Sequence, residues 1–165
     1  MNFEEIFEEF MVHSKDLKVL HVASCGEKGK PNSAPKMLVD IEKPNKVFYL
    51  DYKFTQTYSN ILKNNQISIS FMDDRAFKGF RLTGPCQIVE SGSEYEFAKK
   101  RWEKRVISYE AERLIARSKG FYSERHAEGA LPKDFVIVKL VAGEAAVVKP
   151  DRVLRALWPD TQENK

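Results

Sequence analysis

Short strand-like segments separated by turns follow one another through most of this chain. The segments are residues 18–24, 32–41, 47–50, 67–71 and 79–90, with one or two closing strands over about 135–148. Turns at 26–30 and 42–46 contain the glycine and proline residues typical of hairpin connections. Few helices come between these segments. This close spacing predicts a mainly β (α+β) fold, a small antiparallel barrel of about six strands.

Helical periodicity marks the segments that flank the predicted barrel. Residues 2–12 place phenylalanine, isoleucine and methionine at three- and four-residue spacings with glutamates between them. Residues 57–65 predict a short helix, and about 93–118 predict one long helix, or two with a break near Ser108. A polar loop over 121–134 and a tail over 150–165 complete the chain. With no repeat or linker visible, we expect one domain over 1–165.

The charge pattern excludes several classes of protein. Lys and Arg total 27 against 24 acidic residues, a net charge of +3, and the two signs are interleaved nearly everywhere. Nucleic-acid binders concentrate one sign, so we expect no nucleic-acid partner. No apolar run is long enough to span a membrane, and the acidic N-terminus does not resemble an export signal. Cys25 and Cys86 stand far apart in sequence, so we expect a reduced, cytoplasmic protein.

Familiar catalytic motifs do not occur in the sequence. It contains no glycine-rich phosphate loop, no HExxH and no GxSxG. The histidines, His13, His21 and His126, are scattered, and we expect no metal site. No catalytic residue can be assigned from the sequence.

Residues 51–60 form the segment most suited to binding a small anion. Thr55, Gln56 and Thr57 stand at the expected start of a short helix, where hydroxyls and free backbone amides can meet an anion. Lys53, Lys78 and Arg81 are the cations that could add charge. Ordinary N-capping by Thr55 or Thr57 explains the same residues, so both interpretations stay open.

Three segments in order resemble the pyridoxamine 5'-phosphate oxidase-like family, the FMN-binding split barrels. They are LHVAS…GKPNSAPKM over 20–37, TYSNILKNNQISIS over 57–70 and GFRLTGPCQIV over 79–89. The resemblance covers about residues 3–92 and the remainder more loosely. It implies a six-stranded split barrel with flanking helices, a homodimer, and FMN in grooves between the subunits.

The resemblance also implies which residues bind the cofactor. Ala34, Pro35, Lys36 and Met37 would line the flavin ring, and Trp102 of a partner could border it. The phosphate would be held by Thr55, Gln56 and Thr57 with Lys78 and Arg81. Asp51 and Lys53, in the same 51–60 segment, complete the expected cofactor-binding set, whose full membership is Ala34, Pro35, Lys36, Met37, Asp51, Lys53, Thr55, Gln56, Thr57, Lys78 and Arg81.

Two departures from the family pattern shape the functional hypothesis. Gln56 and Thr57 stand where many relatives have lysine or arginine, so the phosphate charge would fall on Lys53, Lys78 or Arg81. Residues that bind pyridoxal phosphate in the oxidase itself are not recognisable. The hypothesis is therefore an FMN-dependent oxidoreductase with an unknown small-molecule substrate or electron donor. The alternative is a non-enzymatic FMN, haem or deazaflavin binding or electron-transfer protein of the same fold.

Overall fold

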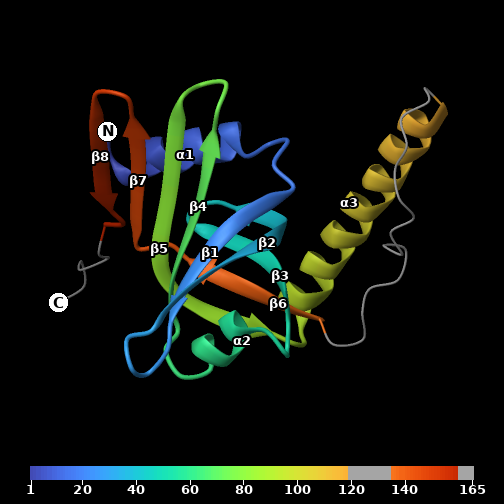
Figure 1. The fold of residues 1–165 in the computed structure, drawn as a ribbon, viewed down its shortest axis with the longest axis horizontal. Helices are drawn as coiled ribbons and strands as arrows, with labels where there is room; N and C mark the ends of the chain where they lie inside the picture. The colour runs from blue at the N-terminus through green and yellow to red at the C-terminus, as the bar shows by residue number, and fades with distance from the viewer. Residues whose placement is uncertain (119–134, 160–165) are drawn as a thin grey trace.

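The computed structural model describes residues 1–118 and 135–159. Its elements alternate short strands with three helices (Figure 1). In chain order they are α1 (Phe3–His13), β1 (Val19–Cys25), β2 (Pro31–Glu42), β3 (Lys46–Tyr52), α2 (Gln56–Ile61), β4 (Gln66–Asp73), β5 (Lys78–Val89), α3 (Ser93–Ser118), β6 (Phe135–Val141), β7 (Glu144–Lys149) and β8 (Arg152–Leu157).

The strands form one antiparallel sheet that closes into a barrel. Its order is β4-β1-β2-β3-β6-β5-β7-β8, and a further pairing of β4 with β5 closes the first six strands on themselves. β7 pairs with the first half of β5, and β8 pairs only with β7, so these two strands extend from the barrel wall. The mainly β fold and the six-stranded antiparallel barrel predicted from the sequence are confirmed.

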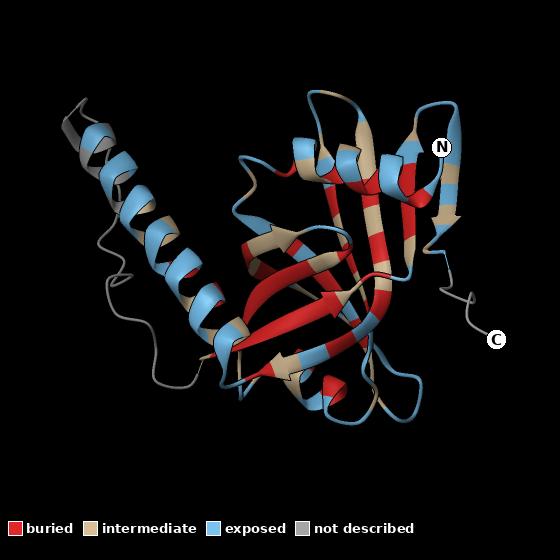
Figure 2. Cartoon of the chain, turned by 180° about the vertical axis from the view of Figure 1, so that it is seen from behind, coloured by how far each residue is buried: buried red, intermediate tan, exposed pale blue. Residues whose placement is uncertain are grey.

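Alternation of apolar and polar residues fills the barrel interior. In β1, Leu20 and Val22 are fully buried, while His21 and Ala23, which alternate with them, are exposed on the outer face. The same period buries Ile67 and Ile69 of β4. Buried residues therefore run along the strands of the barrel, whereas most of α3 is exposed (Figure 2).

Helix α1 packs its apolar face against one end of the barrel. Asn2 caps the helix by accepting from the Glu5 amide at 2.9 Å, and the Glu5 carboxylate accepts from the Asn2 amide at 2.8 Å. Phe3, Ile6, Phe7 and Phe10 are buried in the main core. Trp158 follows β8 and packs edge-to-face with Phe3, with the two ring centroids 4.9 Å apart. The N-terminus and the last described residues are thereby held together.

Helix α3 is one continuous helix, so the alternative of a break near Ser108 is wrong. It leaves the barrel as a long projecting rod (Figure 1). Ala98 and Trp102 anchor its first half in a second apolar cluster that also contains Phe48 and Ile137. Trp102 is 6% exposed, which leaves little of its side chain for the flavin of a partner.

Two elements differ from the sequence prediction by more than one or two residues at their ends. Helix α2 ends at Ile61 rather than at residue 65, because Asn64 turns back to bond the Cys25 carbonyl at 3.3 Å. The tail contains an additional strand, β8. Its exposed residues include both the charged Arg152 and Arg155 and the apolar Val153, so its sequence does not alternate clearly between polar and apolar residues. The predicted polar loop over 121–134 lies outside the described residues.

Within the described parts of the chain, none of the helices combines the length and the apolar character that crossing a bilayer requires.

Candidate functional site

A cluster of polar side chains lies where α2 meets β1, β2 and β3, at the end of the barrel away from α1 (Figure 1). Its centre is a buried ion pair. Met37 of β2 pairs with Leu50 of β3. Because the strands are antiparallel, Lys36, just before Met37, lies beside Asp51, just after Leu50. Lys36 Nζ lies 2.5 Å from Asp51 Oδ1, with side-chain exposures of 6% and 0%. A charge buried this deeply requires a partner, and each residue supplies the other's.

Asp51 also organises the loop that leads into α2. Its Oδ1 accepts from Thr55 Oγ1 at 2.8 Å and from the Tyr52 amide at 2.7 Å, while Oδ2 is buried without a partner among the described residues. Thr55 Oγ1 accepts from the Tyr58 amide at 3.1 Å and is the N-cap of α2. Of the two interpretations left open for Thr55, N-capping is the one that the structure shows.

Amide side chains connect α2 to the barrel wall. Asn60, 4% exposed, donates to Ser24 Oγ at 3.0 Å and accepts from Gln56 Nε2 at 2.8 Å. Asn32 donates to Thr57 Oγ1 at 3.1 Å, and Thr57 is fully buried. Gln56 and Thr57 therefore belong to this network: the Asn60–Ser24 and Asn32–Thr57 bonds hold the short helix against β1 and β2, and the Gln56–Asn60 bond lies within the helix.

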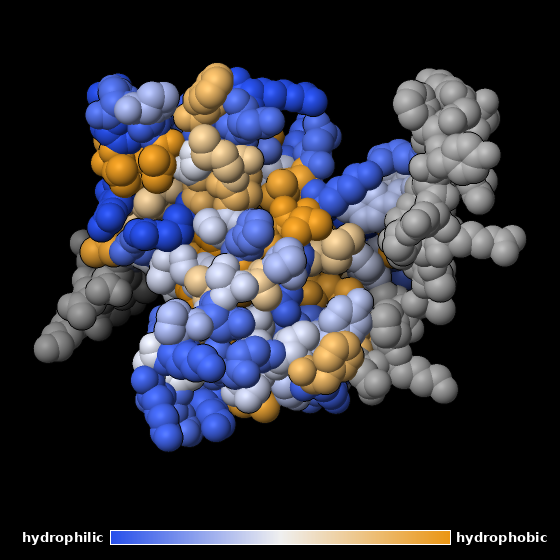
Figure 3. Space-filling model, in the orientation of Figure 1, coloured by the Kyte–Doolittle hydropathy of each residue, from blue (hydrophilic) through white to orange (hydrophobic). Residues whose placement is uncertain are grey.

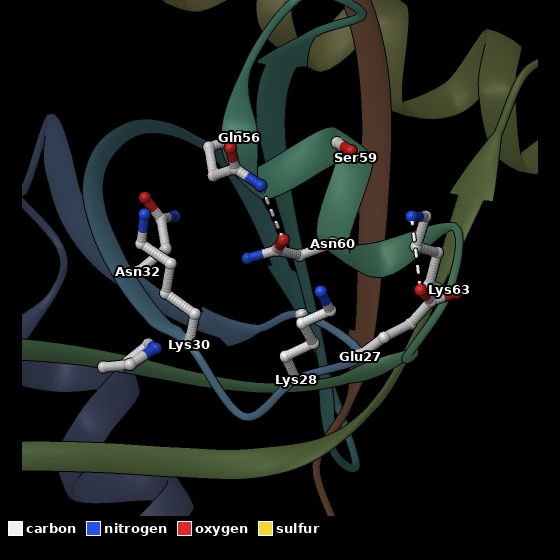
Figure 4. A pocket seen from close by; sticks show the side chains of 10 residues that line it. Glu27, Lys28, Lys30, Asn32, Gln56, Ser59, Asn60 and Lys63 are labelled. Carbon is white, nitrogen blue, oxygen red and sulfur yellow. Dashed lines mark hydrogen bonds and ion pairs between the residues drawn. The ribbon is translucent and has the colours of Figure 1, made fainter.

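A pocket of about 420 Å³ opens between α2 and the β1–β2 hairpin (Figure 4). Hydrophilic residues predominate on the face of this end that Figure 3 shows. The pocket is lined by Gly26, Glu27, Lys28, Lys30, Pro31, Asn32, Gln56, Ser59, Asn60 and Lys63.

The hairpin has a tight backbone geometry that places its side chains at the pocket. The Gly29 amide donates to the Gly26 carbonyl at 3.0 Å, and the Gly26 amide donates to the Lys30 carbonyl at 3.3 Å. Gly29 has a φ of 72°, the left-handed conformation that closes such a turn. A Cβ on Gly26 would lie 3.1 Å from Asn60 Oδ1, so the hairpin approaches α2 closely.

The pocket lining carries an excess of positive charge. Lys28, Lys30 and Lys63 stand against one acid, Glu27, which lies 3.5 Å from Lys63 Nζ. Lys28 and Lys30 form no ion pair with any described residue. Three cations and one anion leave an excess of two positive charges beside three amide side chains. A small dianion is the ligand that this donor set suits.

The three cations predicted to hold a phosphate are instead paired with acids in their own chain. Lys53 lies 3.3 Å from Glu90, Lys78 Nζ lies 2.9 Å from Glu9, and Arg81 Nη2 lies 2.7 Å from Glu144. The Lys78 hydrogen bond lowers the pKa of the Glu9 carboxyl. Lys78 contacts α1, at the end of the barrel away from α2. Lys78 thus lies at the other end of the barrel from Thr55 and Gln56, and each of the three cations already has an acidic partner in the chain.

The residues expected to line a ring continue along β2 from the pocket. Asn32 lines the pocket, and Ala34, Pro35, Lys36 and Met37 follow it on the strand. Pro35 is exposed opposite His21, Ala34 and Met37 are half-buried, and Lys36 is buried in its ion pair. Only Lys36 of these four contacts Asp51 and Thr55.

Five residues that line the pocket are not in the set predicted from the sequence: Lys28, Lys30, Asn32, Ser59 and Lys63. Residues 26–30 were interpreted only as a turn. The sequence feature that could have indicated a cation site is the placement of a lysine on each side of Gly29. A tight turn at Gly29 holds these two lysines close together. The approach of α2 to this turn is a tertiary contact, which the residues of the turn alone do not predict.

Comparison with solved structures supports the fold across nearly the whole chain. A protein from Clostridium acetobutylicum, described as related to general stress protein 26 of B. subtilis and of the pyridoxinephosphate oxidase family, has a TM-score of 0.65 at 20% identity, covering 92% of this chain and 94% of that one. A pyridoxamine 5'-phosphate oxidase-related, FMN-binding protein from Nostoc punctiforme has a TM-score of 0.63 at 12% identity, covering 99% and 94%. A heme-binding protein from Mycobacterium smegmatis has a TM-score of 0.66 at 16% identity, covering 92% of this chain and 57% of that one.

No curated protein matches the chain. The family model of pyridoxamine 5'-phosphate oxidase, in contrast, matches residues 6–149. This match runs from the first helix through β7 and so includes every strand of the closed barrel, the buried ion pair and the pocket. The chain therefore belongs to the pyridoxamine 5'-phosphate oxidase family.

Proposed function

We propose that the protein is an FMN-dependent oxidoreductase that acts on a small-molecule redox substrate or electron donor. The observation that supports this most is the pocket beside α2, which has an excess of two positive charges and opens at the start of β2. The resemblance assigns the next residues of the same strand to the flavin ring.

The donor set fits the cofactor. A phosphate monoester carries close to two negative charges near neutral pH, which matches the charge excess of the pocket. A strand rises about 3.3 Å per residue, so the five steps from Asn32 to Met37 span about 16 Å. An extended ligand can thus place its phosphate at the pocket and its ring along Ala34–Met37.

The flavin, when bound, supplies the hydride or electron transfer, while the protein supplies binding and orientation. Lys36 and Asp51 fix β2 to β3 and hold Thr55 at the start of α2. Asn60 and Asn32 hold α2 against β1 and β2. The cofactor would therefore lie on a surface whose polar groups are already held in place.

A second candidate is a non-enzymatic FMN, haem or deazaflavin carrier or electron-transfer protein. The similarity to the heme-binding protein from Mycobacterium smegmatis favours keeping it, since one barrel serves different cofactors. Such a carrier would bind its cofactor without sustained turnover.

We also propose that the functional unit is a cytoplasmic homodimer. The outer faces of β1 and β2 expose small side chains, Ala23, Ser33 and Pro35, on which a second sheet could lie closely. Cys25 and Cys86 are both free, which is consistent with a reducing compartment.

Purification and cofactor titration test the proposal directly. We expect the recombinant protein to bind FMN, measured by quenching of flavin fluorescence, and to oxidise NADH or NADPH when an acceptor is present. FMN binding without any nicotinamide oxidation, or haem binding in place of FMN, would favour the carrier. Binding of neither FMN, haem nor a deazaflavin would contradict both candidates.

A further inference from the structure

We infer that the cationic part of the phosphate site is supplied by the β1–β2 hairpin, through Lys28 and Lys30, rather than by Lys53, Lys78 or Arg81. This inference rests on the proposed FMN function and assigns the phosphate end of that ligand to the pocket between the hairpin and α2.

The first argument is the availability of charge. Lys53, Lys78 and Arg81 each have a carboxylate within 3.3 Å, so binding a phosphate would require each to give up or share its partner. Lys28 and Lys30 are exposed and have no ion-pair partner among the described residues. Their charges are available to a ligand without breaking an existing ion pair.

The second argument is the direction of the side chains. The turn at Gly29 brings the hairpin back toward α2, and Lys28 extends from it toward Asn60 (Figure 4). Gly26 allows this close approach, because its missing Cβ would lie 3.1 Å from Asn60 Oδ1. The two lysines thus meet the amide-bearing face of α2 across one pocket.

The third argument is the chemistry of the remaining lining. Asn32, Gln56, Ser59 and Asn60 supply amide and hydroxyl groups, and Glu27 is the only acid in the lining. The Glu27 carboxylate is directed to Lys63, at 3.5 Å. Little negative charge is left to repel a phosphate.

The start of α2 carries no cation of its own, because its first two residues are Gln56 and Thr57. Here Gln56 lines the same pocket as Lys28 and Lys30 but is bonded to Asn60. The hairpin lysines restore the charge that the start of α2 lacks.

Comparison of FMN with riboflavin isolates the phosphate, because the two ligands share the ring and the ribityl chain. Both would be titrated by fluorescence quenching into the wild type, the double variant K28Q/K30Q and the matched control K53Q. We expect the wild type to prefer FMN and K28Q/K30Q to lose about tenfold in FMN affinity, while riboflavin affinity stays unchanged. We expect K53Q to keep the wild-type preference.

The outcomes separate this inference from the proposed function. If K28Q/K30Q keeps the full preference for FMN over riboflavin, the inference is overturned and the flavin function stands. If K53Q loses the preference instead, the original assignment to Lys53 is restored. If the wild type binds neither flavin, the proposed function fails and inorganic pyrophosphate becomes the probe. Amide NMR shifts confined to residues 26–30 and Asn60, and abolished in K28Q/K30Q, would then keep the phosphate site, and their absence would overturn it.

Thermal unfolding of each variant serves as the folding control. Both lysines are exposed on a hairpin, so their replacement by glutamine is expected to leave the unfolding temperature unchanged.

Discussion

At the scale of single residues, Lys36 and Asp51 form the most deeply buried ion pair among the residues that the structure describes. Both are almost entirely buried, and Asp51 already leaves one oxygen without a described partner. Their attraction offsets the desolvation of two charges, so removing one member leaves the other buried alone.

The first prediction concerns this pair. Lys36→Met is expected to reduce the free energy of unfolding by about 3 kcal/mol, because Asp51 keeps its charge and loses its counterion. The double variant K36M/D51N is expected to recover part of that loss, since no unpaired charge remains. Urea denaturation measures both. A double variant less stable than K36M would contradict this account.

Residue-scale interactions were the least predictable from the sequence. Lys36 and Asp51 were both named as candidate cofactor residues, but nothing in the sequence indicated that they bond each other. Lys28 and Lys30 were not predicted as site residues, because the sequence of a turn does not indicate which element packs beside it. Pairing across the barrel depends on register and on the position of α2, and neither is encoded locally.

At the scale of elements, β5 is the strand that joins the two parts of the sheet. It pairs with β4 through 78–85, with β7 through 79–83 and with β6 through 86–89. Gly84 lies between the part of β5 that pairs with β7 and the part that pairs with β6. A Cβ there would collide with the Val141 carbonyl oxygen and lie 2.9 Å from the Gly143 nitrogen.

Gly84→Ala is therefore expected to destabilise the fold by about 3 kcal/mol, because the atoms it meets belong to backbone that cannot move aside. Gly79→Ala on the same strand is the matched control. Its Cβ would meet Met72 and Val148 at 3.5 Å, an ordinary contact distance, so we expect little change. Thermal or urea unfolding checks both, and equal effects of the two variants would contradict the argument.

The contact between α1 and β5 predicts a dependence of stability on pH. The Lys78 hydrogen bond lowers the Glu9 pKa from its ordinary value of 4.5. A carboxyl whose pKa is lower in the folded state stabilises the fold above its unfolded pKa, and this contribution is lost as the pH falls through the folded pKa. Stability from this pair is thus present above about pH 4.5 and declines below it.

Lys78→Met is expected to reduce the free energy of unfolding by about 0.5 kcal/mol at pH 7. The difference from the wild type should shrink as the pH falls below 4.5, because protonated Glu9 no longer attracts the lysine. Lys43→Met is the control, since the Lys43 pair with Glu8 is mostly exposed. Urea denaturation over a pH series measures the difference, and a constant value down to the lowest pH would refute the assignment.

Elements themselves were largely predictable. The strands of the barrel alternate clearly, and α1 has a capping residue and an apolar face that the sequence displays. β8 was not predicted because it is short and only half-buried on its inner face, where Leu154 and Ala156 pack against the core; its hydrogen bonds come from pairing with β7. The end of α2 was misplaced because a tertiary bond from Asn64 decides it.

At the scale of the whole molecule, the outer wall formed by β1 and β2 exposes a group of small side chains, Ala23, Ser33 and Pro35. Ala23 pairs with Ser33 on one side and Ser68 on the other, which makes a row of small side chains across three strands. Such a row allows the backbone of another sheet to approach closely. This is the face to which we assign the proposed dimer contact.

Ala23→Arg is expected to convert the proposed dimer to a monomer, because a long charged side chain would stand between the two walls. The fold of each subunit should persist, since Ala23 is exposed. Light scattering after gel filtration measures the mass, with Val12→Arg on α1 as an exposed control. A wild type that is monomeric, or an A23R variant that remains dimeric, would contradict the assignment.

The order of pairing around the barrel has a consequence for how the protein is made on the ribosome. One edge of β3 forms its hydrogen bonds only with β6, so Tyr52 has no strand partner on that side until Phe135 has been synthesised. The second half of β5 pairs with the same strand. Until residues 135–141 emerge, the nascent chain holds an open sheet with two unsatisfied edges and an uncovered apolar lining. Release of the chain after Ser118 should therefore yield a protease-sensitive, aggregating product, because the barrel cannot close before β6 has emerged.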